Sequence, residues 1–199
     1  RGGVNAEIVT CGFISMCGGY YNYDQPHDAG FTNMESYEGQ IVHPQFWPED
    51  MDYSGKKVVV IGSGATAMTL VPSMAEKGAQ VTMVQRSPTY VVSRPDQDKV
   101  ANLFRKVLPE TWAYALTRFK NTVMQGYVYR QTRVSPGMVK RKLLNGVRAY
   151  LGEDVTRRHF TPSYNPWDQR LCLIPNADLF RAINAGTVQV VTEQVDTFT

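Results

Sequence analysis

The chain has 199 residues, of which 43% are hydrophobic and 20% charged, and its formal net charge is +3. This length allows one domain with a sizeable core, or one domain with part of a second. So small a net charge gives no reason to expect a nucleic-acid partner. The three cysteines form no C-x-x-C pattern and the three histidines have no metal-ligand spacing, so we expect a reducing compartment and no metal site. We find no apolar run as long as a membrane span and no signal peptide, which together predict a cytoplasmic protein.

Both ends of the sequence resemble internal parts of a domain. Residue 1 is arginine, and residues 13–17 are predicted to form a buried strand that runs into Gly18 and Gly19. A loop rich in glycine, tyrosine, asparagine and aspartate follows as far as Gly30. No terminating element is recognisable after Val195. We therefore expect an internal fragment of a longer protein.

The next part of the chain predicts a strand, a helix and a second strand. Residues 57–61 (KVVVI) form a β-branched run that suits a parallel strand buried on both faces. Residues 65–77 have the spacing of a helix with one apolar face, made by Ala67, Leu70, Val71 and Met74. Pro72 inside this helix predicts a kink or an exposed turn. Residues 80–86 complete a βαβ unit of the Rossmann type.

Residues 96–160 are expected to be mostly helical, and they contain thirteen Lys and Arg against five Asp and Glu. The sequence predicts three helices here: one over 99–108 capped by Asp96 or Asp98, one over about 110–130, and one opened by Ser135-Pro136. An apolar stretch at 171–174, a helix near 177–185 and a strand at 187–191 follow, and this strand could return to the same sheet. The predicted fold is therefore α/β, a Rossmann-type domain with a parallel sheet and a helical insertion at about 96–160.

The strand at 57–61 ends in a G-x-G-x-x-A turn, Gly62-Ser63-Gly64-Ala65-Thr66-Ala67, which opens the following helix. In this context the pattern indicates dinucleotide binding. Gly62 allows the tight turn, Gly64 lets the backbone approach a pyrophosphate, and Ala67 keeps the helix close to the strand. Free N–H groups and the positive end of the helix then face the phosphates. The alternative is a tight strand–helix turn without a ligand.

Arg86 and Ser87 follow the second predicted strand, where an NAD enzyme more often has Asp or Glu to bind the ribose 2′-hydroxyl. The Arg86 guanidinium is instead a bidentate donor for a 2′-phosphate, and Ser87 can add a hydroxyl. We therefore predict NADPH rather than NADH as the cofactor. The alternative is a solvent-exposed arginine at the end of a strand.

The segment at 37–48 (YEGQIVHPQFWP) has an aromatic-x-G-x-x-x-H-x-x-x-W-P pattern, formed by Tyr37, Gly39, His43, Trp47 and Pro48. Together with the glycine turn, it resembles the fingerprint of the Baeyer–Villiger monooxygenases, flavoenzymes that insert oxygen beside a carbonyl. Tyr37 replaces the usual Phe and keeps the ring. The family's segment joins the FAD and NADP domains, so the resemblance implies a conformational role for His43 rather than an acid–base one. The Trp-Pro ending favours this ketone-oxidising branch over flavin-containing monooxygenases and N-hydroxylases.

The resemblance covers essentially the whole chain and is closest to the ethionamide-activating actinobacterial type, on the strength of the motifs VVIGSGATA and NPWDQRLCL. It implies three parts: the end of an FAD-binding domain at 1–36, an interdomain linker at 37–53, and an NADP-binding domain at 54–199. Residues 13–21 would be a late strand of the FAD domain, with Gly18 and Gly19 near the flavin.

Residues 164–171 (YNPWDQRL) resemble the region where the family has an arginine that stabilises the flavin peroxide anion, and Arg170 aligns with it. The family often has a lysine just before this arginine, which helps to bind the NADP 2′-phosphate. Gln169 stands there in this chain, so Arg86 would provide more of that contact. Without the resemblance, a surface arginine beside an apolar strand is the preferred interpretation of Arg170.

The resemblance implies that NADPH reduces FAD, that reduced flavin reacts with O2, and that Arg170 supplies a fixed positive charge. A ketone would become an ester or lactone, and sulfides could also be oxygenated. Two alternatives stay open: an S- or N-oxygenating flavin monooxygenase, and a non-catalytic NADP-binding module, which we expect of the isolated chain. The basic helical zone also permits contact with an anionic membrane surface. A solvated face with arginines directed at cofactor phosphates is the preferred interpretation, because the sequence shows no clean amphipathic stripe with one basic face.

Overall fold

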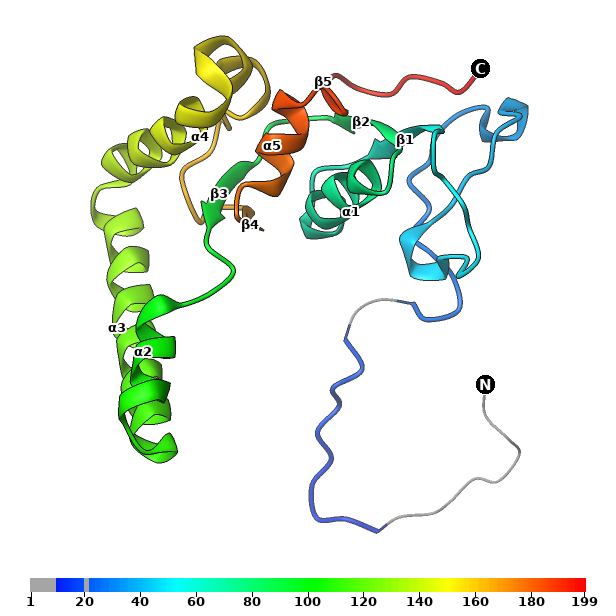
Figure 1. Cartoon of the computed structure of the whole chain (residues 1–199). Coiled ribbons are helices and arrows are strands. Elements are labelled where there is room, and N and C mark those ends of the chain that lie inside the picture. Colours follow the sequence, from blue (N-terminus) through cyan, green and yellow to red (C-terminus); the bar gives the residue numbers. More distant parts are fainter. Residues whose placement is uncertain (1–9, 20–21) are drawn as a thin grey trace.

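The computed structural model of the chain describes residues 10–19 and 22–199, which contain two parallel sheets and five α-helices. The strands are β1 (Lys57–Ile61), β2 (Gln80–Gln85), β3 (Tyr90–Arg94), β4 (Leu171–Pro175) and β5 (Val188–Thr192). The α-helices are α1 (Ala65–Glu76), α2 (Lys99–Val107), α3 (Glu110–Val134), α4 (Pro136–His159) and α5 (Asp178–Asn184), and two short 3-10 helices span Met34–Ser36 and Pro44–Phe46. Figure 1 shows α1 and α5 near the strands and α2 with α3 projecting away from them.

The predicted parallel α/β architecture of Rossmann type is confirmed. The first sheet has the strand order β1-β2-β5, and both pairings are parallel. Ile61 of β1 pairs with Val84, and Gln85 of β2 pairs with Thr192 of β5. The strand predicted near the C-terminus therefore does return to the sheet of the βαβ unit. Its carboxyl end lies beside the ends of β1 and β2, where parallel sheets bind ligands.

The core lies between this sheet and the helices α1 and α5. Val71 of α1, Met83 of β2 and both Leu179 and Phe180 of α5 are fully buried. The Phe180 ring also meets Phe160 edge-on, with 5.8 Å between ring centroids. Burial of each such side chain stabilises the fold by about 1.5–3 kcal/mol. This packing fixes the carboxyl edge of the sheet relative to the start of α1.

Strand β1 differs from its prediction, because it is buried on one face only. Val58 and Val60 pack against the core, whereas Val59 is 58% and Ile61 41% exposed. The reason is that α1 covers one face of β1, and no other helix among the described residues packs against its opposite face. The exposed-turn alternative for Pro72 is also wrong, because Pro72 is buried within a continuous α1.

The strand predicted at residues 13–17 is absent from the described structure. Phe13 and Met16 are 85% and 88% exposed, and the segment has no strand conformation. An apolar run becomes a strand only where another strand satisfies its backbone groups, and no such partner lies beside it here. Residues 20 and 21, which belonged to the same predicted strand region, lie outside the described residues, as do residues 1–9 of the predicted FAD-domain end.

The helical zone forms where the sequence predicts it. Asp98 caps α2, since its carboxylate accepts hydrogen bonds from the backbone N–H groups of Val100 and Ala101. Helix α3 runs four residues beyond its predicted end, to Val134. Ser135 occupies the N-cap position of α4, but its side chain makes no capping hydrogen bond. Among the described residues, we find no helix that is both long and apolar enough to cross a bilayer.

Residues near the C-terminus lie along the segment that precedes residue 37. Thr32 and Thr197 form an isolated parallel bridge, and the Thr32 hydroxyl donates to the Asp196 carbonyl at 2.7 Å. The Phe198 ring lies between Phe31 and Tyr37, at centroid distances of 5.7 and 5.9 Å. No element is recognisable here from the sequence, and only the structure shows this attachment.

Candidate functional site

The glycine turn at residues 62–67 lies at the carboxyl ends of β1 and β2. The Gly62 N–H donates to the Val84 carbonyl at 2.7 Å, which ties the turn to the neighbouring strand. Gly62 has a φ of +132°, a conformation that residues with a Cβ rarely adopt. Gly64 is the N-cap of α1 and provides no side-chain cap. The first N–H groups of the helix are therefore free of a side-chain acceptor and available to an anion.

The remaining residues of the turn divide into anchors and exposed positions. Ser63 is buried, and its hydroxyl lies 3.2 Å from that of Thr89. The Cys172 thiol of β4 lies 3.8 Å from the Ser63 carbonyl, and burial raises the pKa of this thiol. Ala67 is buried, as close packing of α1 on the sheet requires, while Ala65 and Thr66 are exposed. The Ser63 side chain thus holds the turn onto the second sheet.

Arg86 and Ser87 follow β2 at the same edge of the sheet and are exposed. Arg86 forms no ion pair with any described residue, so its guanidinium is free for an external anion. The preceding residue, Gln85, is 1% exposed and donates through Nε2 to the His159 carbonyl at 2.7 Å and to the Thr192 hydroxyl at 3.0 Å. These bonds fix the backbone from which Arg86 projects.

Arg170 lies next to the glycine turn, although the two are far apart in the sequence. Its Nη1 atom is 3.8 Å from the position that a Cβ on Gly64 would occupy. The arginine is exposed, and its own carbonyl accepts a hydrogen bond from the Tyr164 hydroxyl at 3.0 Å. Tyr90 of β3 in turn donates to the Tyr164 carbonyl at 2.7 Å, and burial raises the pKa of Tyr90 to about 12. Two tyrosines therefore link the start of β4 to β3.

The loop that leads to Arg170, residues 165–170, is held by α3. Arg133 donates through Nη2 to the Pro166 carbonyl and to a carboxylate oxygen of Asp168, both at 2.8 Å. Trp167 has a φ of +68°, in the left-handed region that is costly for a residue with a large side chain. Its ring meets Tyr129 of α3 edge-on at 6.3 Å between centroids.

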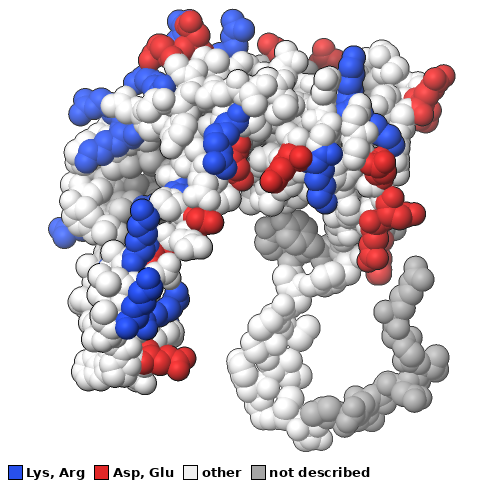
Figure 2. All heavy atoms as spheres, viewed as in Figure 1, with Lys and Arg blue, Asp and Glu red and all other residues white. Residues whose placement is uncertain are grey.

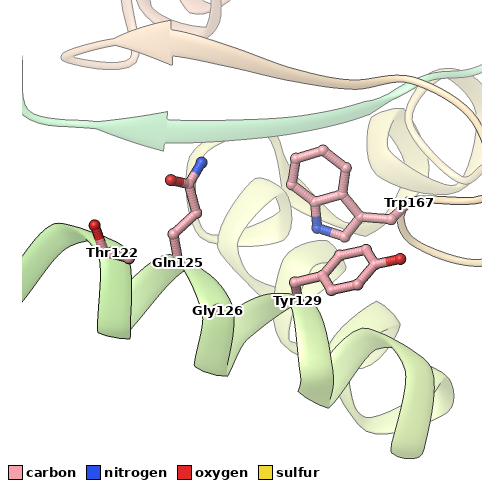
Figure 3. Close-up of a pocket in the computed structure, with 5 residues that line it drawn as sticks. All are labelled: Thr122, Gln125, Gly126, Tyr129 and Trp167. Carbon is pink, nitrogen blue, oxygen red and sulfur yellow. The ribbon is translucent and has the colours of Figure 1, made fainter.

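A pocket opens between α3 and this loop, lined by Thr122, Gln125, Gly126, Tyr129 and Trp167. Figure 3 shows the Tyr129 and Trp167 rings next to each other, with the Gln125 side chain rising from the same helix. Sequence reasoning identified neither Arg133 nor Tyr129. An arginine and a tyrosine on an exposed helix form no sequence motif. Only the tertiary fold shows that they contact the 165–170 loop.

The 37–48 segment makes contacts that explain several of its residues. A Cβ on Gly39 would lie 2.5 Å from the Tyr37 ring, so a glycine lets the ring fold back over this backbone. The His43 ring accepts through Nδ1 from the Gln45 N–H at 3.2 Å and begins a 3-10 helix. Trp47 meets Tyr53 edge-on at 6.1 Å, and both pack at the margin of the core. Pro48 is half-buried beside Trp47.

Two predicted site residues are not joined to this arrangement. Gly18 and Gly19 lie in the exposed N-terminal segment, and a Cβ added to either would meet no atom within 4 Å. Their predicted place near a flavin stays a prediction. No group of three or more potential metal ligands occurs among residues 10–19 and 22–199.

The sequence of residues 5–140 matches the model of the FMO-like family, described as flavin-binding monooxygenase-like. The chain belongs to the flavin-binding monooxygenase-like family. It is 53% identical over 196 residues to the FAD-containing monooxygenase EthA of Mycobacterium tuberculosis, covering 97% of this chain and 40% of EthA. It is also 52% identical over 188 residues to the probable FAD-binding monooxygenase AlmA of Acinetobacter baylyi, covering 94% of this chain and 38% of AlmA.

Solved structures of flavin monooxygenases have the same fold. A steroid monooxygenase bound to NADP matches with a TM-score of 0.59 at 19% identity, over 84% of this chain and 38% of that one. Cyclohexanone monooxygenase from Rhodococcus sp. Phi1, bound to NADP+, matches with a TM-score of 0.59 at 14% identity, over 86% and 40%. The chain thus spans about two fifths of the length of these flavin monooxygenases. The family resemblance found in the sequence is confirmed.

Proposed function

We propose that this chain is the nicotinamide-nucleotide-binding part of a flavin-dependent monooxygenase that uses NADPH, FAD and O2 to insert oxygen beside a ketone carbonyl. The division into an FAD-domain end at 1–36, a linker at 37–53 and an NADP-binding domain at 54–199 belongs to the same proposal. The juxtaposition that supports it best is the exposed Arg170 guanidinium beside the glycine turn at the carboxyl edge of the sheet. A turn of this type in this place suits a dinucleotide diphosphate.

The glycine turn fits a diphosphate because space and donors coincide there. A Cβ on Gly62 would meet nothing within 4 Å, and one on Gly64 would meet only the Arg170 guanidinium. Phosphate oxygens can therefore approach the backbone N–H groups at the start of α1 without steric hindrance. The positive end of the α1 dipole and the Arg170 cation both favour an anion here.

Arg86 is the residue that we propose selects NADPH over NADH. It projects from the end of β2, the strand next to the glycine turn, and has no ion-pair partner among the described residues. A 2′-phosphate bound here would receive two parallel charge-assisted hydrogen bonds, which a 2′-hydroxyl cannot match. NADPH supplies the hydride for the reduction of FAD, and this chain's residues bind and orient the dinucleotide.

Arg170 is proposed to supply a permanent positive charge where negative charge develops during oxygen insertion. Because its Nη1 lies so close to Gly64, the same guanidinium can also reach the diphosphate of the dinucleotide. Loss of Arg170 is then expected to lower NADPH affinity as well as ester formation. The Trp47-Pro48 ending supports a ketone substrate in preference to a sulfide or amine, by resemblance to the Baeyer–Villiger branch.

The decisive experiment measures binding of NADPH and NADH to the wild-type chain, to Arg86→Ala and to Arg94→Ala. Arg94, at the end of β3 in the other sheet, is the matched control, since its removal changes the net charge equally. Loss of a charge-assisted pair worth about 1.5–3 kcal/mol should weaken NADPH binding roughly ten- to a hundredfold. NADH binding should hardly change. Equal losses for both dinucleotides in Arg86→Ala would contradict the assignment.

The reaction itself is tested in a protein of the relatives' full length that contains this chain. A panel of ketones, sulfides and amines is offered with NADPH, FAD and O2. Esters or lactones from the ketones would support the proposal. Oxygenation of sulfides or amines alone would replace it with an S- or N-oxygenating flavin monooxygenase.

A further inference from the structure

The projecting pair of helices α2 and α3, called the α2–α3 hairpin (residues 99–134), leaves an apolar stripe in solvent. On α3 the stripe is formed by Trp112, Leu116, Phe119, Val123 and Tyr127, which recur at intervals of four, three, four and four residues. This spacing puts all five side chains on one face of the helix. Their exposed fractions run from 39% to 68%, so no described part of the chain covers them.

Helix α2 adds a second stripe to the same surface. Its exposed apolar side chains are Val100, Leu103 and Val107, again on one face. Ala101 of α2 and Ala113 of α3 are each 2% exposed and mark the seam between the helices. The helices are antiparallel, since Asp98 at the start of α2 pairs with Lys120 in the middle of α3. Viewed along each helix from its N-terminus, the exposed stripe lies on the same rotational side of the buried alanine. Because the two helices are antiparallel, this places both stripes on the same side of the hairpin.

The hairpin is strongly cationic as well as apolar. Between residues 99 and 134 a single acidic residue, Glu110, stands against seven basic ones: Lys99, Arg105, Lys106, Arg118, Lys120, Arg130 and Arg133. The rest of the chain has fourteen Lys and Arg against seventeen Asp and Glu, so the positive charge of the protein is concentrated here. Figure 2 shows blue side chains along the projecting hairpin.

We propose that this face of the α2–α3 hairpin binds the surface of an anionic lipid bilayer. A bilayer surface accommodates both properties at once: the apolar stripe enters the boundary between headgroups and acyl chains, and the cations remain at the anionic headgroups. Trp112 and Tyr127 are of the residue types that favour this boundary. The helices would lie in the surface plane rather than span the bilayer.

Charge argues against a second copy of the chain as the occupant. Lys120 is already paired with Asp98 and Arg133 with Asp168, but two such hairpins face to face would still bring two sets of five other cations together, with one Glu110 on each to offset them. A protein partner would also have to desolvate cations that flank the apolar stripe. An anionic surface avoids both costs, and each Lys or Arg near it contributes about 1 kcal/mol of attraction.

The proposal is tested by co-sedimentation of the chain with phosphatidylcholine vesicles that contain, or lack, phosphatidylserine. We expect binding to the anionic vesicles, a marked decrease at high salt, and little binding to the neutral ones. The double variant Trp112→Gln, Phe119→Gln should bind at least tenfold more weakly. Both positions are highly exposed, at 65% and 68%, so these substitutions leave the core intact. Phe13→Gln, which removes an even more exposed aromatic ring (85%) outside the hairpin, is the control and should bind like the wild type.

Three results would overturn the proposal. Equal loss of binding in Phe13→Gln and in the double variant would show that this face is not the one involved. A concentration-dependent dimer that the double variant abolishes, without vesicle binding, would assign the face to a second copy. Vesicle binding by the chain but not by a protein of the relatives' full length would assign it to the remainder of that protein.

Discussion

Replacing Arg133 by alanine tests how the 165–170 loop is held beside the glycine turn. Arg133 bonds the Pro166 carbonyl and the Asp168 carboxylate, each at 2.8 Å. The Arg133 and Asp168 side chains are 42% and 40% exposed, so solvent screening leaves their ion pair about 0.2–1 kcal/mol. The charged bond to the carbonyl of buried Pro166 contributes about 1.5–3 kcal/mol.

The total of about 2–4 kcal/mol is enough to offset the cost of about 1–2 kcal/mol for the left-handed backbone of Trp167. Without Arg133, the loop therefore has little reason to keep Trp167 in this conformation. We expect the loop to relax locally while the core stays folded. Arg170 would then leave the neighbourhood of Gly64, and the affinity for NADPH would decrease.

Hydrogen exchange of the 164–170 peptide and urea unfolding measure the two effects separately. Arg130→Ala is the matched control, because it removes the same charge from the same helix without breaking a side-chain hydrogen bond to a described residue. Arg133→Lys should give an intermediate result, since one ammonium cannot reproduce the guanidinium fork. Exchange in the 164–170 peptide that is the same in Arg133→Ala and Arg130→Ala would refute the reasoning.

Three further predictions concern the glycine turn, the 37–48 segment and pH. Gly62→Ala should lower the free energy of unfolding in urea by about 1–3 kcal/mol, because Gly62 has a positive φ. Gly64→Ala should unfold like the wild type but bind NADPH more weakly in a titration. The reverse pattern would contradict both expectations. Gly39→Ala should displace the Tyr37 ring and cost about 0.5–1.5 kcal/mol in urea unfolding, and an unchanged midpoint would count against it. Burial lowers the pKa of His159 below its usual 6.5, so stability should fall as pH falls below about 6.5, and His159→Gln should flatten that slope in unfolding measured from pH 7 to 5.

Local signals in the sequence predicted most elements of the fold. The β-branched run and the helical spacing after it placed β1 and α1, and the caps at Asp98 and Ser135 placed the starts of α2 and α4. Strand β3 was missed because its partner β4 lies far along the chain, beyond the helical zone. The strand at residues 13–17 was predicted wrongly for the complementary reason: its apolar residues have no partner strand in the described structure.

The candidate site was less accessible to sequence reasoning than the fold. The glycine turn follows from its strand–helix context, and Arg86 follows from its place after the next strand. The approach of Arg170 to Gly64 cannot be derived from spacing, because all of α2, α3 and α4 separate them in the sequence. Arg133 carried no signal at all, since its role depends on where the 165–170 loop folds.

The position of β1 also has a consequence for how the chain behaves in solution. One row of its backbone N–H and C=O groups faces away from β2, beside the exposed side chains of Val59 and Ile61. Such an edge is a template onto which another extended polypeptide can add by main-chain hydrogen bonds. Lys56 and Lys57 place positive charge at the start of β1, which disfavours strand addition there, while its far end is apolar. The free chain should therefore be prone to self-association through this edge. A peptide strand that pairs with the edge should keep the chain monomeric.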